Sequence, residues 1–182
     1  MAINKTASNS KGRNAMPMSS ILDYDTRDFD VSGLAVSPED GEFLVCAASP
    51  TGVATRTGPT FAAHEPNQGA MLRMVWSENS RSDLTASGRK RVPVLWRKSA
   101  HFKVQLYNYD SAALPNSGQL LTVAVAQEAV NGDSGTTRLV LEPVVTGSAL
   151  TFWCVGHVVA DVAKAGDPME VYLYDAPRLT AI

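Results

Sequence analysis

The acidic run DYDTRDFD, which begins at Asp23, contains residue types that could bind a metal ion. Carboxylates at this spacing could hold Ca²⁺, which takes oxygen ligands. A calcium loop of the EF-hand type starting at Asp23 would need glycine at position 28 and glutamate at position 34, where this chain has Asp28 and Leu34. We therefore interpret the run as a solvated segment with Tyr24 and Phe29 packed beneath it.

Cysteine and histidine spacing predicts no metal site and no cofactor. The chain has neither a CxxC nor an HxxxH pattern, which are common zinc-binding arrangements. Cys46 and Cys154 both lie in apolar runs, which predicts buried free thiols, with a Cys46–Cys154 bridge as the alternative. His157 also lies in an apolar run and is predicted to be a hydrogen-bonded core or interface residue.

The motif that most resembles a catalytic sequence is NGDSG, which contains Ser134. An earlier FAAH segment ends at His64. The GDSG letters are similar to the nucleophile motif of chymotrypsin-like serine peptidases, which are β-barrel proteins. The resemblance implies Ser134 as the nucleophile and His64 as the base, with backbone amides near the serine as an oxyanion hole. Asp83 or Asp110 would be the acidic partner. The chain departs from the family pattern at Thr136, where a glycine normally follows.

The same letters also predict a hairpin turn. Asn131-Gly132 stands between the runs QLLTVAVA and TTRLVLEP, and Asn-Gly is the strongest short hairpin signal. We favour the turn and predict no catalytic residue. A serine peptidase that uses His64 and Ser134 is the alternative from another functional class.

The charge of the chain favours protein partners. A net charge of −2 and a pI near 5.9 give no general attraction to nucleic acid, which usually needs a basic face. The basic runs Arg89-Lys90-Arg91 and Arg97-Lys98 flank the apolar stretch VPVLW and predict a solvated rim, with a phosphate or acidic-partner patch as the alternative. No apolar stretch approaches the roughly 20 residues that span a bilayer. With no signal-peptide core at the N-terminus, we expect a soluble protein made in a cytoplasm.

Short apolar runs predict an all-β protein with a single β-barrel or β-sandwich domain and an extended N-terminal arm. We expect the arm at residues 1–34 and the domain at residues 35–182, because 182 residues suit one domain. Helices of a turn or two are expected near 110–114 or 161–165. The turn segments are SPEDG, SPTG, EPNQG, PNSG, NGDSG and AGDP. The predicted strands are EFLVCAA, AMLRMVWS, RVPVLW, HFKVQLYN, QLLTVAVA, TTRLVLEPV, ALTFWCVGHVV and MEVYLY.

Period-two patterning within these runs predicts the core. Trp76, Trp96 and Trp153 are also expected to pack inside. In HFKVQLYNYDSAALPNSGQLLTVAV, the PNSG loop between two apolar runs predicts a hairpin or a meander corner. The predicted core positions are Leu44, Leu72, Val94, Phe102, Val104, Leu106, Val123, Leu139, Leu141, Phe152, Val158, Val171 and Leu173.

The arm is rich in Asn, Ser, Lys and Gly over residues 1–20, so by itself it should be disordered. Packing on its own domain could hardly offset the backbone entropy of ordering it, about 1 kcal/mol or more per residue. We therefore expect the arm to bind a neighbouring subunit by strand addition. The predicted contact residues are Met16, Met18, Ile21, Leu22, Tyr24 and Phe29.

The layout of the chain resembles that of a head decoration (cement) protein of a tailed bacteriophage, a β-barrel that sits at junctions between capsomers. The polar arm, the paired strands VPVLWRKSAHFKVQLYN and the late strand TFWCVGHVVADV followed by DPMEVYLYD carry the resemblance. It implies a non-enzymatic virion structural protein that stabilises a capsid. Its partners would be the major capsid protein or other virion subunits, and it would form a dimer or trimer on the particle. A tail-tube subunit or a small coat protein is the alternative of the same class.

Overall fold

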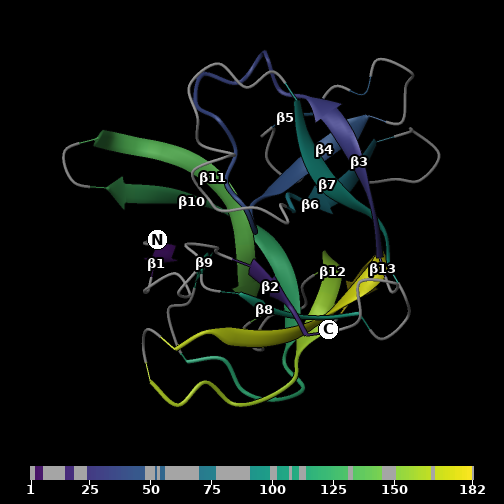
Figure 1. The fold of residues 1–182 in the computed structure, drawn as a ribbon. Helices are drawn as coiled ribbons and strands as arrows, with labels where there is room; N and C mark the ends of the chain where they lie inside the picture. Colours follow the sequence, from purple (N-terminus) through teal and green to yellow (C-terminus); the bar gives the residue numbers. More distant parts are fainter. Residues whose placement is uncertain are drawn as a thin grey trace.

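The computed structural model contains strands and no helix in the residues that it describes, so the predicted all-β class is confirmed. The strands form an 11-stranded sheet and a 2-stranded sheet. The large sheet curls into a half-barrel, and the small sheet stands beside it (Figure 1). The described residues are 3–5, 15–18, 24–47, 52, 54–55, 70–76, 91–98, 102–106, 108–110, 114–130, 133–144, 151–164 and 167–181.

The large sheet has the hydrogen-bonded order β1-β9-β11-β10-β12-β13-β8-β2, with β4 attached to β11 and with β5 and β6 attached to β4. Its pairs are antiparallel except for β9 with β11. The small sheet pairs β3 antiparallel with β7. The bounds are β1 (Ile3–Lys5), β2 (Ala15–Pro17), β3 (Tyr24–Asp30), β4 (Phe43–Ala47), β5 (Ala54–Thr55), β6 (Ala70–Met74), β7 (Arg91–Lys98), β8 (Lys103–Leu106), β9 (Asn108–Asp110), β10 (Leu120–Val130), β11 (Asp133–Pro143), β12 (Thr151–Val158) and β13 (Met169–Ala181).

Two apolar cores meet at β4, which is buried on both faces. Phe43 and Val45 belong to the main core of the half-barrel, whereas Leu44 and Cys46 belong to a small core that β3 and β7 complete. Because successive strand residues point to opposite faces, a continuous apolar run such as FLVCA indicates a strand covered on both sides. The members of the small core are Phe29, Val31, Leu44, Cys46, Ala54, Val75, Val92 and Val94.

An aromatic cluster connects the small sheet to the main core. Tyr24 of β3 meets Trp76 and Phe102 in edge-to-face contacts, with ring centroids 5.4 Å apart in both cases. Trp76 and Phe102 also contact each other, at 5.7 Å. Such pairs stabilise by about 0.5–1.5 kcal/mol beyond the area that they bury. Tyr24 and Phe29 therefore pack beneath their polar segment, as predicted.

The predicted core is confirmed wherever its side chains are described, with the exception of Phe152. Phe152 is half-buried because it lies in the end of β12 that extends past the half-barrel, where Trp153 is the residue that turns inward. Trp76 is buried as expected, whereas Trp96 is half-buried. The predicted core side chains outside the described residues are Val104 and Leu106.

The hairpin or meander corner expected between the two runs of residues 101–125 is wrong. The turn itself forms, with Gly118 at φ 80° and the Gln119 amide donating to the Asn116 carbonyl. However, β8 pairs with β13 and β2, so two strands separate it from β10 in the sheet. Ser117 ties the loop to the end of β12 by donating from its hydroxyl to the Val159 carbonyl, at 2.8 Å. Turn residues fix where the chain reverses, but the strands far along the sequence decide what it pairs with.

The short helices expected near 110–114 and 161–165 are also absent from the described residues of these segments. Residues 108–110 form β9, and residues 161–164 are irregular. The second segment is held by the Val162 amide, which donates to the Pro115 carbonyl at 2.9 Å. Buried Val162 belongs to the main core, so tertiary packing sets this backbone.

Segments that the sequence assigns to the arm also pair within the chain. β3 pairs with β7 from Tyr24 to Asp30, β2 pairs with β8, and β1 pairs with β9. Phe29 is fully buried in the small core. β3 therefore pairs within its own domain, which the expectation of an independent arm did not include, whereas Asp25 to Asp28 are exposed and contact with a neighbour stays a prediction.

Gly156 allows β12 and β13 to approach each other around a large bulge. Cys154 pairs with Arg178 and Gly156 pairs with Leu173, so several β13 residues bulge opposite Val155. A Cβ atom on Gly156 would lie 2.2 Å from the Tyr172 carbonyl oxygen. Backbone atoms cannot give way as a flexible side chain can, so glycine is required here.

Replacing Gly156 by alanine should destabilise the fold. We expect Gly156→Ala to lower the free energy of unfolding by about 1–3 kcal/mol or more, because the added methyl overpacks against backbone. Gly33→Ala is the matched control, since nothing lies within 4 Å of the Cβ position there. Urea unfolding followed by tryptophan fluorescence measures both, and equal midpoints for the two variants would contradict the assignment.

Candidate functional site

A buried ion-pair cluster connects β11 to the loop before β4. Nη1 of Arg138 lies 2.7 Å from Oε2 of Glu42, and Nη2 lies 3.4 Å from Oε1 of Glu39. The three side chains are between 0% and 5% exposed. The Glu42 carboxylate also accepts a hydrogen bond from the Glu39 amide. The charged atoms thus bond one another inside the protein, which makes the cluster a structural joint.

Asp40 extends this joint to the N-terminal segment. Its Oδ2 accepts the backbone N–H of Ala15 at 3.0 Å, and both residues are fully buried. The sequence predicted only a turn at SPEDG, and Gly41 at φ 83° fits that turn. The burial of its carboxylates was missed because their partners come from distant segments. The one available signal was three acids in a single turn next to an apolar run.

Breaking the joint should cost far more than breaking a surface pair. Arg138→Met leaves buried carboxylates without their cation, so we expect a loss of about 3–5 kcal/mol in unfolding free energy. Lys103→Met is the control: the Lys103–Glu170 pair spans 3.2 Å but is 25% and 29% exposed, and such pairs contribute about 0–1 kcal/mol. Chemical denaturation compares the two variants, and a similar small loss in both would show that the cluster is not a joint.

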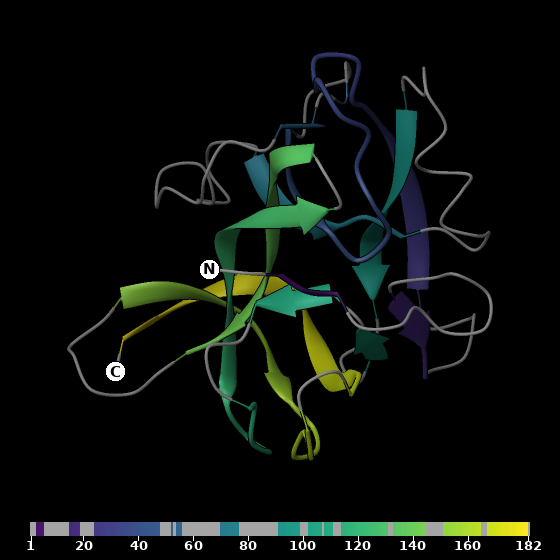
Figure 2. The same ribbon diagram turned by 90° about the vertical axis from the view of Figure 1, so that its left-hand side faces the viewer.

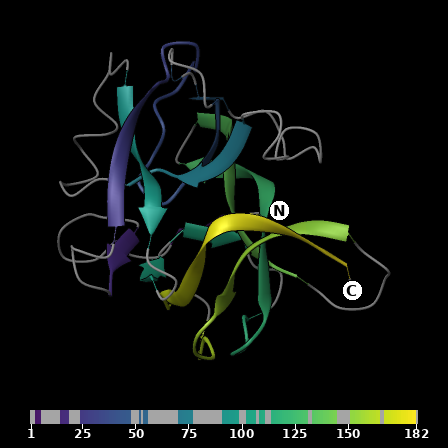
Figure 3. The same ribbon diagram turned by 90° about the vertical axis from the view of Figure 1, so that its right-hand side faces the viewer.

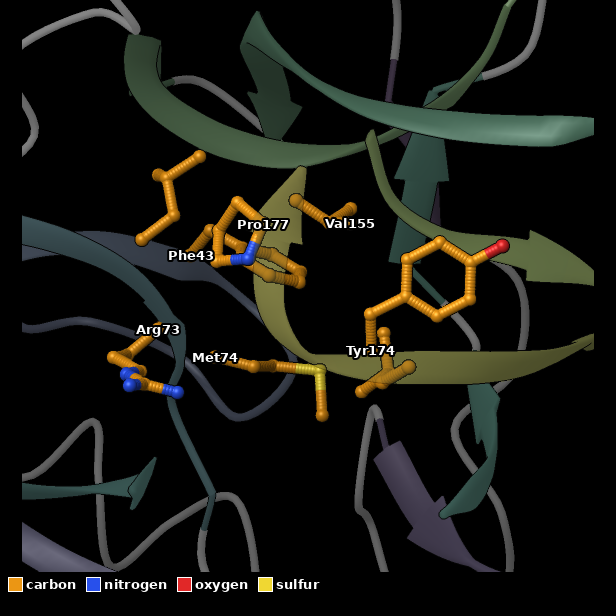
Figure 4. A pocket seen from close by; sticks show the side chains of 8 residues that line it. Phe43, Arg73, Met74, Val155, Tyr174 and Pro177 are labelled. Carbon is orange, nitrogen blue, oxygen red and sulfur yellow. The ribbon is translucent and has the colours of Figure 1, made fainter. Parts of the chain in front are cut away.

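A shallow hollow lies where the β13 bulge meets β6. It is lined mainly by apolar side chains, with Arg73 and Tyr174 as its polar members. In Figure 4, Arg73 and Tyr174 lie on opposite sides, with Phe43, Met74 and Pro177 between them. Its cavity volume of about 10 Å³ is close to the room that one water needs. The hollow is too small for an organic substrate.

The hollow's arginine is part of a stack on Trp96. The guanidinium of Arg73 lies 5.0 Å from the Trp96 ring centroid, and that of Arg27 lies 4.8 Å from it. Nη1 of Arg73 also donates to the Asp175 carbonyl at 2.8 Å. Burial lowers the pKa of Arg73, against the opposing effects of Asp175 and Cys46. The stack covers the edge of the small core. Of its two arginines, Arg27 is exposed and Arg73 is buried.

A second group of titratable side chains lies along β12 and β13. Nδ1 of half-buried His157 is 3.1 Å from the Tyr174 hydroxyl, which confirms its prediction as a hydrogen-bonded residue. Burial raises the pKa of Tyr174 and of Cys154, so both are held in their neutral forms. Cys154 and Cys46 are free, buried thiols, as predicted. Burial raises the pKa of Cys46 to about 12. The two thiols and the Tyr174 hydroxyl are therefore poor nucleophiles at neutral pH.

Both thiols should resist modification in the folded protein. The thiolate is the reactive form, and the raised pKa of each thiol keeps it protonated at pH 8. We expect a disulfide reagent to label neither cysteine rapidly in buffer and both in urea. Val36→Cys, at a side chain that is 41% exposed, supplies a rapidly labelled control. Labelling of the unmodified chain as fast as of that variant would contradict the burial.

The predicted contact residues of the arm lie in different environments. Met18 is 44% exposed, and it follows β2 with its amide donating to the Lys103 carbonyl. Tyr24 and Phe29 pack in this chain's own cores. Ile21, Leu22 and the Met16 side chain lie outside the described residues. Met18 is therefore the contact residue that the structure describes as accessible, and binding by the arm stays a prediction.

Of the two residues of the peptidase alternative, the structure describes Ser134 but not His64. Ser134 lies within β11, and Val130 of β10 pairs with Asp133 of β11. β10 and β11 therefore form the predicted hairpin, and its turn residues Asn131 and Gly132 lie outside the described residues. His64 lies outside the described residues. In the described residues, no group of three or more His, Cys, Asp and Glu side chains could hold a metal ion.

The β10–β11 hairpin forms a ribbon that leaves the half-barrel. Figure 1 shows its distal half extending to the left, above β1. Val123 is 4% exposed, whereas Val125, on the same face of β10, is 47% exposed. β10 thus leaves the core between these two valines, whereas β11 stays buried as far as Arg138, which pairs with Ala126. The distal ends of β12 and β13 form a second ribbon in another direction, to the left in Figure 2 and to the right in Figure 3.

Comparison with known proteins gives no relative for this arrangement: no family model, curated protein or solved structure matches the chain. Among the described residues there is also no helix with the length and apolar character needed to cross a membrane.

Proposed function

We propose that this chain is a non-enzymatic structural protein of a virion that binds a capsid as a decoration or cement protein. The observation that carries the proposal is the β10–β11 ribbon, whose distal half extends away from the half-barrel (Figure 1) and whose Val125 is 47% exposed. Ordering a strand costs about 1–2 kcal/mol per residue in backbone entropy. Strands that bury little surface in their own domain offset this entropy cost when they pack against another subunit.

The chemistry of the remaining sites supports contact more than catalysis. Arg138, Glu39 and Glu42 bind one another in the structural joint, and the hollow at Arg73 has room for about one water. The thiols and Tyr174 are held protonated by burial. The chain's net charge of −2 favours a protein partner over nucleic acid. The capsid assignment itself comes from the layout of the chain.

Shortening the ribbon should abolish particle binding without unfolding the domain. Gln127 pairs with Thr137, so replacing residues 128–136 by Asn-Gly closes the hairpin early with favourable turn residues. We expect the unmodified chain to co-sediment with capsids of its virus and the shortened chain to bind at least about tenfold more weakly, a loss of about 1.4 kcal/mol. Gly33→Ala, which changes a residue outside the two strands of the ribbon, serves as the binding control.

Two outcomes would overturn the proposal. The first is absence of the unmodified chain from purified virions and from added capsids. The second is covalent labelling by a fluorophosphonate probe that Ser134→Ala abolishes, which would instead identify the serine peptidase. We expect no labelling, because Ser134 lies in a hairpin strand.

A further inference from the structure

Beyond Leu121, the outer edge of β10 pairs with no other strand in the described part of the structure. β10 pairs with β11 along its length, but on its other side it pairs with β12 only at Leu120 and Leu121. Beyond Leu121 the two ribbons diverge, as Figures 1 and 2 show. From Thr122 onward, the backbone groups of this edge have no strand partner among the described residues. Such a row of backbone donors and acceptors is a template for another strand.

Other strand edges of this protein carry residues that discourage pairing. The large sheet ends at β1, which contains Lys5, and at β2, which contains Pro17. In the small sheet, β7 contains Arg91 and Pro93. Charges and prolines at edges prevent unwanted strand addition. The β10 segment 120–127, LLTVAVAQ, has neither a charge nor a proline, so its open edge is unprotected.

The distal end of β12 is the nearest competitor. Residues 151–155, TFWCV, are also uncharged and lie beyond the same junction. This edge is shorter, and Trp153 and Cys154 are already buried by the chain. β10 has the longer open edge and, at Val125, an apolar side chain that is 47% exposed. The β10 edge is therefore the better place for a partner.

We propose that the β10 edge binds the β10 edge of a second copy of this chain, antiparallel, so that two ribbons join into one four-stranded sheet. A two-fold axis at Ala124 places Val125 beside the partner's Val123 and Thr122 beside the partner's Ala126. Glu128 lies beyond this paired stretch, so no like charges meet. The β10 edge carries no charge, and the same segment of a second copy is an uncharged strand that matches it in length. Val125 then extends the apolar strip that Val123 begins.

This inference rests on the proposed function, because it names a second copy of the chain as one neighbour that the β10–β11 ribbon binds during assembly. It concerns the purified chain, however, and so it can fail separately. A chain that is monomeric yet binds capsids would refute the dimer and leave the proposed function standing. A chain that forms the dimer but binds no capsid would refute the proposed function and leave the dimer standing.

The test compares Val125→Lys with Val36→Lys by sedimentation equilibrium. Both valines are exposed, at 47% and 41%, but Val36 lies in the loop before β4. We expect the unmodified chain and Val36→Lys to be dimers at about 100 μM, and Val125→Lys to dissociate at least about tenfold more readily, since an edge lysine opposes strand addition. Monomeric unmodified chain, or a dimer that Val125→Lys leaves intact, overturns the proposal.

A cross-link tests the register. Ala124→Cys places two thiols opposite each other at the axis, where a cross-strand pair is close enough for a disulfide. Oxidation should give a covalent dimer, and Val36→Cys should not. The native cysteines are buried and should not interfere. A dimer without this cross-link would assign the interface to another surface, and protection of β10 amides only when capsid is present would assign the edge to a capsid strand; either result overturns the proposal.

Discussion

The guanidinium of Arg138 is the point on which the packing of β11, the loop before β4 and the N-terminal segment depends. It stands on β11, where it is buried, and it binds the carboxylates of Glu42 and Glu39 in the loop that leads into β4. From that loop, Asp40 holds Ala15 of the N-terminal segment. The Val75 amide donates to the Glu42 carbonyl, which attaches the chain after β6 to the same loop. One turn therefore fixes the half-barrel, the small core and the start of the chain relative to one another.

Such a joint contributes specificity more clearly than stability. Removing two charges from water is costly, and their attraction inside the protein only partly repays that cost. Apolar burial supplies the driving force, with β4 covered on both faces and the Tyr24 cluster closing the main core. The ion pairs are directional, so they select one placement of the loop among many that would bury similar area. This role is an interpretation for the present protein and follows from the geometry of the cluster.

The same construction separates a rigid body from the ribbons that leave it. Within the body, Arg138 is paired with Glu39 and Glu42, the thiols are neutral and the hollow beside Arg73 is the size of a water. The β10–β11 ribbon has the opposite character, with an open edge and an exposed apolar face at Val125. A protein built in this way is suited to adhesion: the body holds its shape, and the ribbons present backbone and apolar surface to a neighbour.

Local patterns in the sequence determined the all-β class, most of the strands, the Asn-Gly hairpin and the burial of both cysteines, because alternation and turn chemistry act between residues that are close along the chain. The sequence could not show that YDTRDFD is a strand, since its partner β7 is supplied from far along the chain and only Phe29 becomes fully buried. Likewise, the acids of SPEDG look solvated until Arg138 is placed beside them. The tertiary structure alone decided which strands pair, which charges are buried and which edge stays open, because each depends on contacts between distant segments whose loop-closure entropy and packing no local pattern records.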